Sequence, residues 1–506
     1  MGEISERLNA MFRLHSLTLV NHPILGNIHL EFCHQYNLEQ GVYTSVVIGA
    51  NGIGKSYLLR VLAEIFCCLE ALKQEDEITT PRYYFKLNYS SYWQSYEFAN
   101  FRDINPVIQG QRRFTNFVFV CEGKDTDVHQ MSLPKRVIAS STTINDKYVA
   151  KSTDMYRYKG LRNEKSPSST GTRTMVRKTV DSLLSSLDEK YGFRIELRKL
   201  LEDLKLQPRL ELSYNLRYKD MFVKEGMTAD KLIYIFEHQK ELFKRKTDIW
   251  GTSNFNTIKE KEPWKLDEAA SLLSRLDYRG YGSGKQLLKY KLLEEDPTVG
   301  EDRLGLKVLT SLDLLSYPTL KVYKSSDEYT FDQSSSGESN LLCQMVGIMS
   351  DIEPNSLVLI DEPENSAHPN WQISYIGWLK KIFMWYPGCH FVISTHSHFM
   401  LTDLEPESSD IVALEKKDGI IRDVSEGVNT FNWTVDDILY RVFHVRNTRN
   451  YVLENKMVEL YHLVSGRTNE KQKLNGLIEE LSQYQLNNED PLIKLLETAK
   501  AYVESI

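Results

Sequence analysis

The sequence predicts an α/β protein that combines a mixed sheet, an antiparallel β subdomain, a long and mostly helical insertion, and a helical C-terminal region. Three observations support this fold class. Residues 43–48 form an apolar, β-branched run that ends in a glycine-rich turn, and a helical pattern follows over 55–72. Similar apolar runs at 356–361 and 389–395 alternate with helical patterns, as parallel strands do. Residues 12–20 instead alternate between apolar and polar side chains, which is typical of an antiparallel strand.

The composition is that of an ordinary globular protein. The chain has 506 residues, of which 41% are apolar and 26% charged, so it is neither collagenous nor wholly disordered. At about 150 residues per domain, this length predicts roughly two to four domains. The 62 basic and 69 acidic side chains give a net charge of −7. Any nucleic-acid site is therefore expected to be local rather than spread over the surface.

The sequence also bears on the cellular compartment. Its six cysteines include no C-x-x-C pair, which favours a reducing environment. No apolar run reaches the ~18 to 20 residues that a membrane span requires. The first residues lack the basic stretch and apolar segment of a secretion signal. We therefore expect a cytoplasmic protein without a membrane segment.

The first predicted domain covers residues 1–150. After the strands already named, residues 82–122 are rich in Tyr and Phe and are expected to form antiparallel strands covering this lobe. Residues 133–141 read as one further strand.

The second predicted domain, 151–300, begins with a basic loop and continues as a mostly helical insertion. Residues 147–178 contain nine Lys or Arg and two acids, a local charge of +7, and are expected to be solvated and mobile. This segment either contacts nucleic-acid phosphates or is a flexible basic loop without a ligand. Helical patterns then occur at 178–205, 228–246 and 265–276.

The third predicted domain, 301–425, returns to the α/β pattern, with a helix at 334–350 and a hairpin near Asp418-Gly419. Residues 426–506 are predicted to be helical and to serve as an oligomer or partner contact.

The strongest chemical signal is the run Gly49 to Ser56 (GANGIGKS), which fits G-x-x-x-x-G-K-[ST] between a predicted strand and a helix. Backbone amides of such a loop, together with a helix N-terminus, bind phosphate. Lys55 would reach the β- and γ-phosphates, and Ser56 would bind Mg²⁺. The alternative is a chance glycine turn. The predicted ATP contacts here are Asn51, Gly52, Ile53, Gly54, Lys55 and Ser56.

A second signal follows the buried run at 356–360, which ends in Asp361 and Glu362. Asp361 can bind Mg²⁺ opposite Ser56. Glu362 can then orient and deprotonate an attacking water. The alternative is a strand that ends in a solvated acidic turn.

Two further motifs complete the set. Ser335, Ser336, Gly337 and Glu338 open a predicted helix and can form another anion site, although serine-rich helix caps are common. His396 follows the strand at 389–395 and can sense or polarise a γ-phosphate; the alternative is a hydrogen-bonded loop histidine.

These four motifs, in this order, resemble the ATPase head of the ABC superfamily, with its Walker A, signature, Walker B and switch-histidine elements. The likeness is closest to the soluble OLD-like and SMC-like branch, because the signature reads Ser-Ser-Gly-Glu and Asp361 to Pro369 reads DEPENSAHP. The resemblance implies ATP and Mg²⁺ as cofactors. It also implies that the signature acts on the ATP of a second copy, and hence a head-to-head dimer or higher homo-oligomer.

One element of that family is missing. No glutamine follows the strand near residue 140 where the Q-loop is expected, and Asn145 or Asp146 is the candidate substitute. Arg13 on the first strand either approaches the nucleotide or is a surface arginine.

Looser matches narrow the branch. Residues 133–141, 156–162 and 430–443 resemble PtuA, the ATPase family of the Septu anti-phage systems and of related retron systems. The alternatives are a basic edge strand for 156–162 and an amphipathic core helix for 430–443. The resemblance implies a defence role in which an HNH nuclease of the PtuB type is supplied in trans, since the helical C-terminal region leaves no room for a nuclease fold in this chain.

Two other function classes remain open. One is an SMC-like DNA-repair or DNA-end-binding ATPase that uses residues 147–178. The other is a nucleotide-dependent scaffold with negligible turnover.

Overall fold

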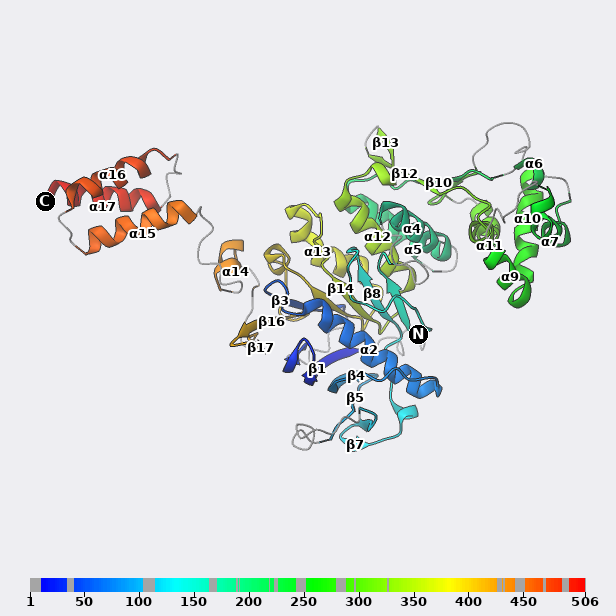
Figure 1. Cartoon of the computed structure of the whole chain (residues 1–506), viewed down its shortest axis with the longest axis horizontal. Coiled ribbons are helices and arrows are strands. Elements are labelled where there is room, and N and C mark those ends of the chain that lie inside the picture. Colours follow the sequence, from blue (N-terminus) through cyan, green and yellow to red (C-terminus); the bar gives the residue numbers. More distant parts are fainter. Residues whose placement is uncertain are drawn as a thin grey trace, which may run out of the picture. The chain divides into compact units, whose positions relative to one another are not determined.

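The structure is a computed structural model, and Figure 1 shows the whole chain. It describes residues 11–33, 41–102, 114–162, 171–187, 190, 192–217, 219–222, 226–242, 252–278, 288–294, 297–324, 327–425, 430, 433–441, 451–466, 470–484 and 491–505. The chain divides into two compact units, Met1–Trp433 and Thr434–Ile506, and each is described by itself.

A seven-stranded mixed sheet forms the centre of the first unit. Its order is β17-β16-β3-β15-β14-β8-β9, and every neighbouring pair is parallel except β16 and β17. The predicted α/β class is therefore confirmed. The strands are β3 (Tyr43–Gly49), β8 (Val137–Ser141), β9 (Tyr156–Lys159), β14 (Leu357–Asp361), β15 (His390–Ser394), β16 (Ser409–Lys417) and β17 (Ile420–Asp423).

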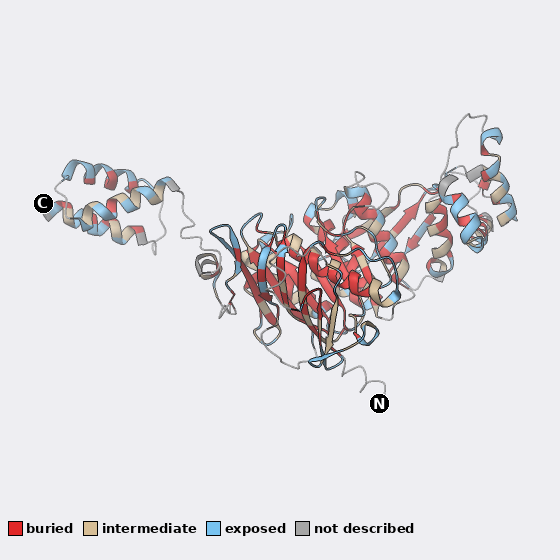
Figure 2. Ribbon diagram, turned by 60° about the horizontal axis from the view of Figure 1, so that its bottom comes forward, coloured by how far each residue is buried: buried red, intermediate tan, exposed pale blue. Residues whose placement is uncertain are grey.

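Helices cover both faces of this sheet, which explains why its strands are apolar throughout. Leu357 and Leu359 of β14 join the same hydrophobic core as α2 (Lys55–Gln74). Val358 is also fully buried but lies outside that core, as expected of a side chain on the opposite face. The second face is covered by α12 (Ser336–Asp351), which packs on β8 and β9. Figure 2 shows the buried strands between these layers.

The predicted antiparallel β subdomain is also present. Its six strands have the order β2-β1-β4-β5-β6-β7. Aromatic side chains join it to α2, since Phe66 of α2 lies 5.4 Å from Tyr89 and 5.8 Å from Phe12, measured between ring centroids. The strands are β1 (Arg13–His22), β2 (Gly26–Glu31), β4 (Tyr84–Ser91), β5 (Gln94–Ala99), β6 (Val118–Cys121) and β7 (Lys124–Asp125).

The structure places Arg13 neither at the nucleotide nor at the surface, the two positions expected for it. Its guanidinium is buried and donates to the backbone carbonyls of Phe12 (2.8 Å), Gly41 (3.2 Å) and Cys389 (3.4 Å). It therefore ties the start of β1 to the segments that lead into β3 and β15, rather than facing solvent or a nucleotide.

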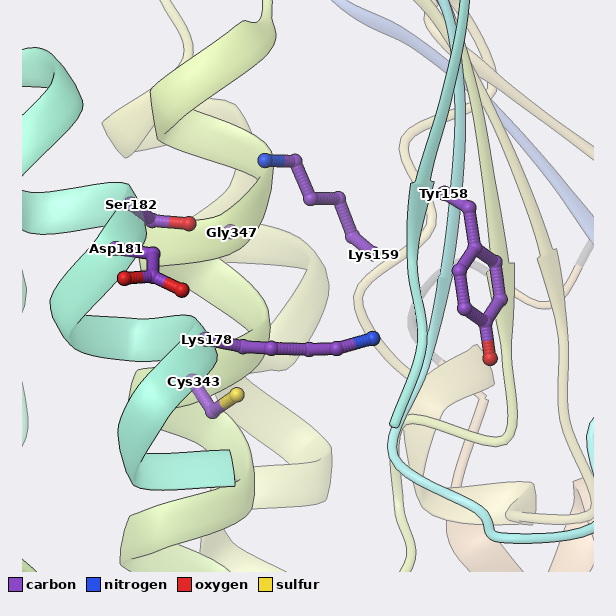
Figure 3. A pocket seen from close by; sticks show the side chains of 7 residues that line it. All are labelled: Tyr158, Lys159, Lys178, Asp181, Ser182, Cys343 and Gly347. Atoms are coloured by element: carbon purple, nitrogen blue, oxygen red, sulfur yellow. The ribbon is translucent and has the colours of Figure 1, made fainter. Parts of the chain in front are cut away.

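The basic segment 147–178 is more ordered than its composition predicts. Tyr156–Lys159 forms β9 at the edge of the central sheet, so a solvated loop is wrong for these residues and the edge-strand alternative is right. Residues 163–170 lie outside the described ranges. Helix α4 (Thr172–Ser186) then packs on α12. In Figure 3, Lys159 extends from β9 towards these two helices while Tyr158 lies on the other side of the strand.

An antiparallel sheet combines strands of the insertion with strands of the third predicted domain. It has the order β11-β10-β12-β13, and β11 falls where no strand is predicted. Its strands are β10 (Leu210–Tyr214), β11 (Leu288–Lys291), β12 (Thr319–Lys324) and β13 (Asp327–Thr330). The helices of the insertion are α5 (Phe193–Asp203), α6 (Lys219–Phe222), α7 (Ala229–Glu237), α8 (Gln239–Leu242), α9 (Thr252–Lys261), α10 (Trp264–Tyr278) and α11 (Pro297–Ser311).

The second unit is helical, as predicted. Helices α15 (Tyr451–Ser465), α16 (Lys471–Ser482) and α17 (Pro491–Ser505) share a core that includes Leu460, Leu474 and Leu492. A shorter helix, α14 (Val435–Arg441), precedes them, and the rest of the 430–443 motif lies largely outside the described residues. No helix in the described ranges is both long and apolar enough to cross a membrane.

Candidate nucleotide-binding site

Three parallel strands bring the predicted motifs to one edge of the central sheet. In the strand register, Asp361 at the end of β14 is opposite Ser394 of β15, and Ser394 is opposite Val47 of β3. The segments that follow these strands carry the glycine-rich loop, Glu362 and His396. The carboxyl edge of a parallel sheet is where such folds bind ligands.

The loop after β3 requires its glycines. Gly49, Gly52 and Gly54 have φ values of 150°, 76° and 109°. A Cβ at Gly54 would lie 2.6 Å from Leu25 Cδ2, and one at Gly49 would lie 2.6 Å from the Leu414 carbonyl oxygen. Gly54 also caps α2 without a side-chain hydrogen bond. The helix N-terminus is therefore open to an anion.

Ser56 and Asp361 meet across 305 positions of sequence. The Ser56 hydroxyl donates to Asp361 Oδ1 at 2.9 Å, and the Ser394 hydroxyl donates to the same oxygen. Burial raises the pKa of Asp361, partly offset by these two hydroxyls. A serine hydroxyl beside a carboxylate is an oxygen donor set that fits Mg²⁺, which commonly uses few protein ligands together with substrate phosphates.

Lys55 lies under the loop with its ammonium group enclosed. Its Nζ donates to the Gly49 carbonyl at 2.8 Å and lies 2.9 Å from His396 Nε2. Burial lowers the pKa of Lys55 to about 8. The structure therefore places Lys55, the predicted phosphate-binding residue, in direct contact with His396, the predicted switch histidine.

Glu362 is the third member of this group. Its Oε1 lies 3.4 Å from His396 Nε2, and this hydrogen-bonding partner is the main cause that lowers the pKa of Glu362. Glu362 has a φ of 48°, which is uncommon for a side chain of its size. An ionised carboxylate held beside the phosphate loop has the chemistry of a general base.

Glu364 was not among the predicted site residues. Its Oε1 accepts a hydrogen bond from the His396 backbone N–H at 2.6 Å. The acidic run Asp361-Glu362-Pro363-Glu364 is the sequence signal that could have pointed to it.

The signature residues are arranged differently. Ser335 is the N-cap of α12, and its hydroxyl accepts from Glu338 N at 3.2 Å while the Glu338 carboxylate accepts from Ser335 N at 3.2 Å. Ser336 is exposed. A Cβ at Gly337 would lie 2.5 Å from the Ser366 carbonyl oxygen. Among the residues that the structure describes, no hydrogen bond joins this motif to the glycine-rich loop.

The two candidates for the Q-loop position, Asn145 and Asp146, lie in different environments. The Asp146 carboxylate accepts from Arg162 NH2 at 2.6 Å and from the Tyr158 hydroxyl at 2.7 Å. It is therefore occupied within the chain, whereas Asn145 is exposed.

Comparison with known proteins adds a family likeness. A family model described as "AAA domain, putative AbiEii toxin, Type IV TA system" matches residues 161–401. That range includes the signature, Asp361, Glu362 and His396, and it begins after the glycine-rich loop.

Solved SMC head domains are similar at low identity. The Smc head domain of Pyrococcus furiosus with an extended coiled coil, bound to the C-terminal domain of ScpA, is 11% identical. That match covers 86% of this chain and 100% of that chain, with a TM-score of 0.32. The SMC head domain of Thermotoga maritima is 9% identical, and the match covers 82% of this chain and 100% of that chain, with a TM-score of 0.34. The AAA likeness of residues 161–401, together with the geometry of the phosphate loop, supports an ATPase in general terms.

Proposed function

We propose that the chain binds ATP with Mg²⁺ at the Gly49–Ser56 loop and hydrolyses it, in the manner of an ABC-type head. The observation that carries this proposal is the contact between Ser56 and Asp361, because it joins two motifs from opposite halves of the sequence at 2.9 Å. A chance glycine turn or a solvated acidic turn would not require it.

The roles follow from the geometry. Ser56 and Asp361 would hold Mg²⁺, which neutralises phosphate charge when bound. Lys55 would exchange its contact with Gly49 O for a phosphate oxygen, and Glu362 would accept a proton from the attacking water. His396 would contact the γ-phosphate. The remaining loop contacts would come from Asn51, Gly52, Ile53 and Gly54.

The signature would act between copies of the chain. Ser335, Ser336, Gly337 and Glu338 lie at the start of α12, and Ser336 is exposed. In this proposal they close over the ATP of a second copy. The active form would be a head-to-head dimer or a larger homo-oligomer.

At the cellular level, we propose a sensor or scaffold subunit of an anti-phage complex in the cytoplasm. It would control an HNH nuclease of the PtuB type supplied in trans. Support comes from the PtuA-like segments and from the matching family, which is described as a putative AbiEii toxin of a type IV toxin–antitoxin system. The insertion (151–300) and the helical region (426–506) would form the partner contacts.

A second candidate is an SMC-like ATPase that binds DNA ends. The observation favouring it is the charge of +7 over residues 147–178. Lys151, Arg173 and Arg177 within this segment are exposed. Affinity for DNA through these side chains should fall steeply with salt.

The test of the ATPase proposal is Glu362→Gln. If Glu362 is the general base, this variant should hydrolyse ATP about 10²–10⁴-fold more slowly while retaining ATP binding. Glu415→Gln, on the exposed end of β16, is the matched control and should behave as the wild type. Unchanged turnover in Glu362→Gln would remove Glu362 from this role.

The mass of the protein in solution distinguishes the two proposed cellular functions. Light scattering of the chain, with and without ATP and with a co-expressed HNH nuclease, should give a stable oligomer that retains the nuclease. A monomer that dimerises only with ATP, ignores the nuclease and binds DNA ends would favour the SMC-like reading.

A further inference from the structure

Two backbone segments meet beside the phosphate loop, and Glu364 joins them. Residues 361–364 follow β14, and residues 394–397 follow β15. The first bond between them runs from Glu362 N to the Ser394 carbonyl at 3.0 Å. The second runs from His396 N to Glu364 Oε1 at 2.6 Å. The Glu364 side chain therefore supplies a bond that the strand ladder no longer provides after Asp361 and Ser394.

The other oxygen of Glu364 makes this arrangement costly. Oε2 is buried and has no hydrogen-bond partner among the described residues. Burial raises the pKa of Glu364, although hydrogen bonds with the His396 N–H, with its own N–H and with the Thr395 side chain oppose this shift. Burying a carboxyl group with one unpaired oxygen is destabilising. The hydrogen bond that it forms with the His396 backbone, at 2.6 Å, helps to offset this cost.

His396 has no substitute for this bond. Its neighbours have their own anchors: Thr395 N donates to the Val47 carbonyl at 3.0 Å, and the Ser397 hydroxyl donates to Gln372 Oε1 at 2.6 Å. Only Glu364 holds the His396 N–H within the described residues. Glu364 thus holds the one N–H of this segment that belongs to His396 itself.

The same bond constrains Glu362. Its φ of 48° is a sparsely populated conformation, which persists only where the surroundings over-determine it. Glu362 lies between its own bond to Ser394 O and the Glu364 bond two residues later. These two bonds hold the turn that brings Glu362 within 3.4 Å of His396.

We propose that Glu364 is a positioning residue for hydrolysis, which clamps the His396 backbone so that the imidazole stays between Lys55 and Glu362. This inference rests on the proposed function, because the clamp matters to turnover only if Glu362 and His396 act on ATP. Glu364 itself makes no contact with the reacting atoms in this mechanism.

Two substitutions test the clamp. Glu364→Ala removes the acceptor and should lower kcat roughly 10- to 100-fold, the size of a lost hydrogen bond to a charged group, with KM for ATP within about twofold. Glu364→Gln keeps an acceptor oxygen of the same reach and should retain most of kcat. Glu415→Ala is the surface control and should match the wild type.

A double-mutant cycle separates positioning from a general structural loss. If Glu364 acts chiefly through the imidazole of His396, then Glu364→Ala should cost clearly less in the His396→Ala background than in the wild type. Losses that multiply would overturn the proposal, as would a wild-type kcat in Glu364→Ala.

Hydrogen exchange gives a readout that does not depend on turnover. Without nucleotide, Glu364→Ala should increase exchange in the peptide that spans residues 392–400, whereas Glu364→Gln should not. Unchanged exchange in Glu364→Ala would refute the clamp. A chain that neither binds nor hydrolyses ATP but shows the expected exchange would instead refute the proposed function and leave the clamp standing.

Discussion

The phosphate-loop site and the signature motif use their polar groups in opposite ways. Lys55, Ser56, Asp361 and His396 come from distant parts of the sequence and contact one another directly. The signature instead makes mainly local bonds, since Ser335 and Glu338 bond to each other's backbone at the start of α12 and Lys324 of the nearby strand β12 donates to Glu338.

This difference distinguishes the half of the site that folding of one chain assembles from the half that a second copy would complete. Long-range contacts at the phosphate loop mean that folding of the first unit builds that half of the site. The signature is held by its own capping box and by Lys324 of β12, whose Nζ donates to Glu338 Oε1 at 3.0 Å, and it leaves Ser336 exposed. An exposed motif at a helix start is suited to meet a ligand that arrives on another molecule, which is what action between copies requires.

The largest expected effect breaks the first half of this comparison. Lys55→Ala removes the cation beneath the loop and should abolish measurable ATP binding, because phosphate charge is then unopposed there. Titration with a fluorescent ATP analogue measures this. Lys417→Ala, at the exposed end of β16, is the control. Tight binding by Lys55→Ala would contradict the phosphate-loop assignment.

A substitution in the signature motif should leave ATP binding intact. Ser336→Arg places a large cation on the exposed signature and should lower hydrolysis by about 10²-fold, comparable to losing a transition-state donor, without changing ATP affinity. Thr79→Arg, in an exposed loop, is the matched control.

Mixing the two inactive variants sharpens the result. A pair of Lys55→Ala and Ser336→Arg chains contains one intact loop facing one intact signature, so the mixture should hydrolyse ATP faster than either variant alone. A mixture that stays inactive would mean that the signature works within its own chain.

A smaller effect is expected where the two halves touch. Gly337→Ala would set a Cβ against the Ser366 carbonyl and should lower the free energy of unfolding by about 1–3 kcal/mol, as overpacking does. Urea unfolding followed by tryptophan fluorescence measures it. Gly476→Ala, in α16, has open space around its Cβ and should be stabilising by ~0.5–1 kcal/mol instead. Equal stability of wild type and Gly337→Ala would show that this contact relaxes freely.

The smallest effect concerns acid and the strands that support the phosphate loop. Burial lowers the pKa of His15 and of His22 to about 4. The unfolded chain then takes up protons near pH 6.5 that the folded chain refuses, so the stabilising effect is complete above pH 6.5 and is lost as the pH falls towards 4. Each histidine should contribute about 1 kcal/mol after allowance for solvent screening. Urea midpoints at pH 7.5 and 5 measure the loss, and His22→Gln should reduce it. A midpoint that is equal at both pH values would contradict this account.

Local sequence patterns predicted the elements of the head because each strand and helix there has a regular hydrophobic periodicity and ends in recognisable turn residues. Strand β11 was missed because its pairing with β10 joins residues far apart, and no local pattern reports that contact. The basic residues of β9 led to the wrong prediction of a solvated loop, because Arg157 and Lys159 pair with Asp351 of α12 rather than facing solvent.

The site was predictable where a motif encodes its chemistry. Ser56, Asp361 and His396 belong to such motifs, and the structure brings all three together. Glu364 and Arg13 were not predictable, because their parts depend on backbone groups that only the folded chain presents to them.

The order of the central sheet has a consequence for synthesis. Strand β3 carries the phosphate loop, but both of its neighbours, β15 and β16, are made hundreds of residues later. A nascent chain therefore exposes an apolar strand through most of translation, a state in which unpaired edges invite aggregation. If the chain binds ATP as proposed, the loop gains its full strand support only after β16 has left the ribosome, so that ATP binding would mark a polypeptide whose catalytic core has been completely translated.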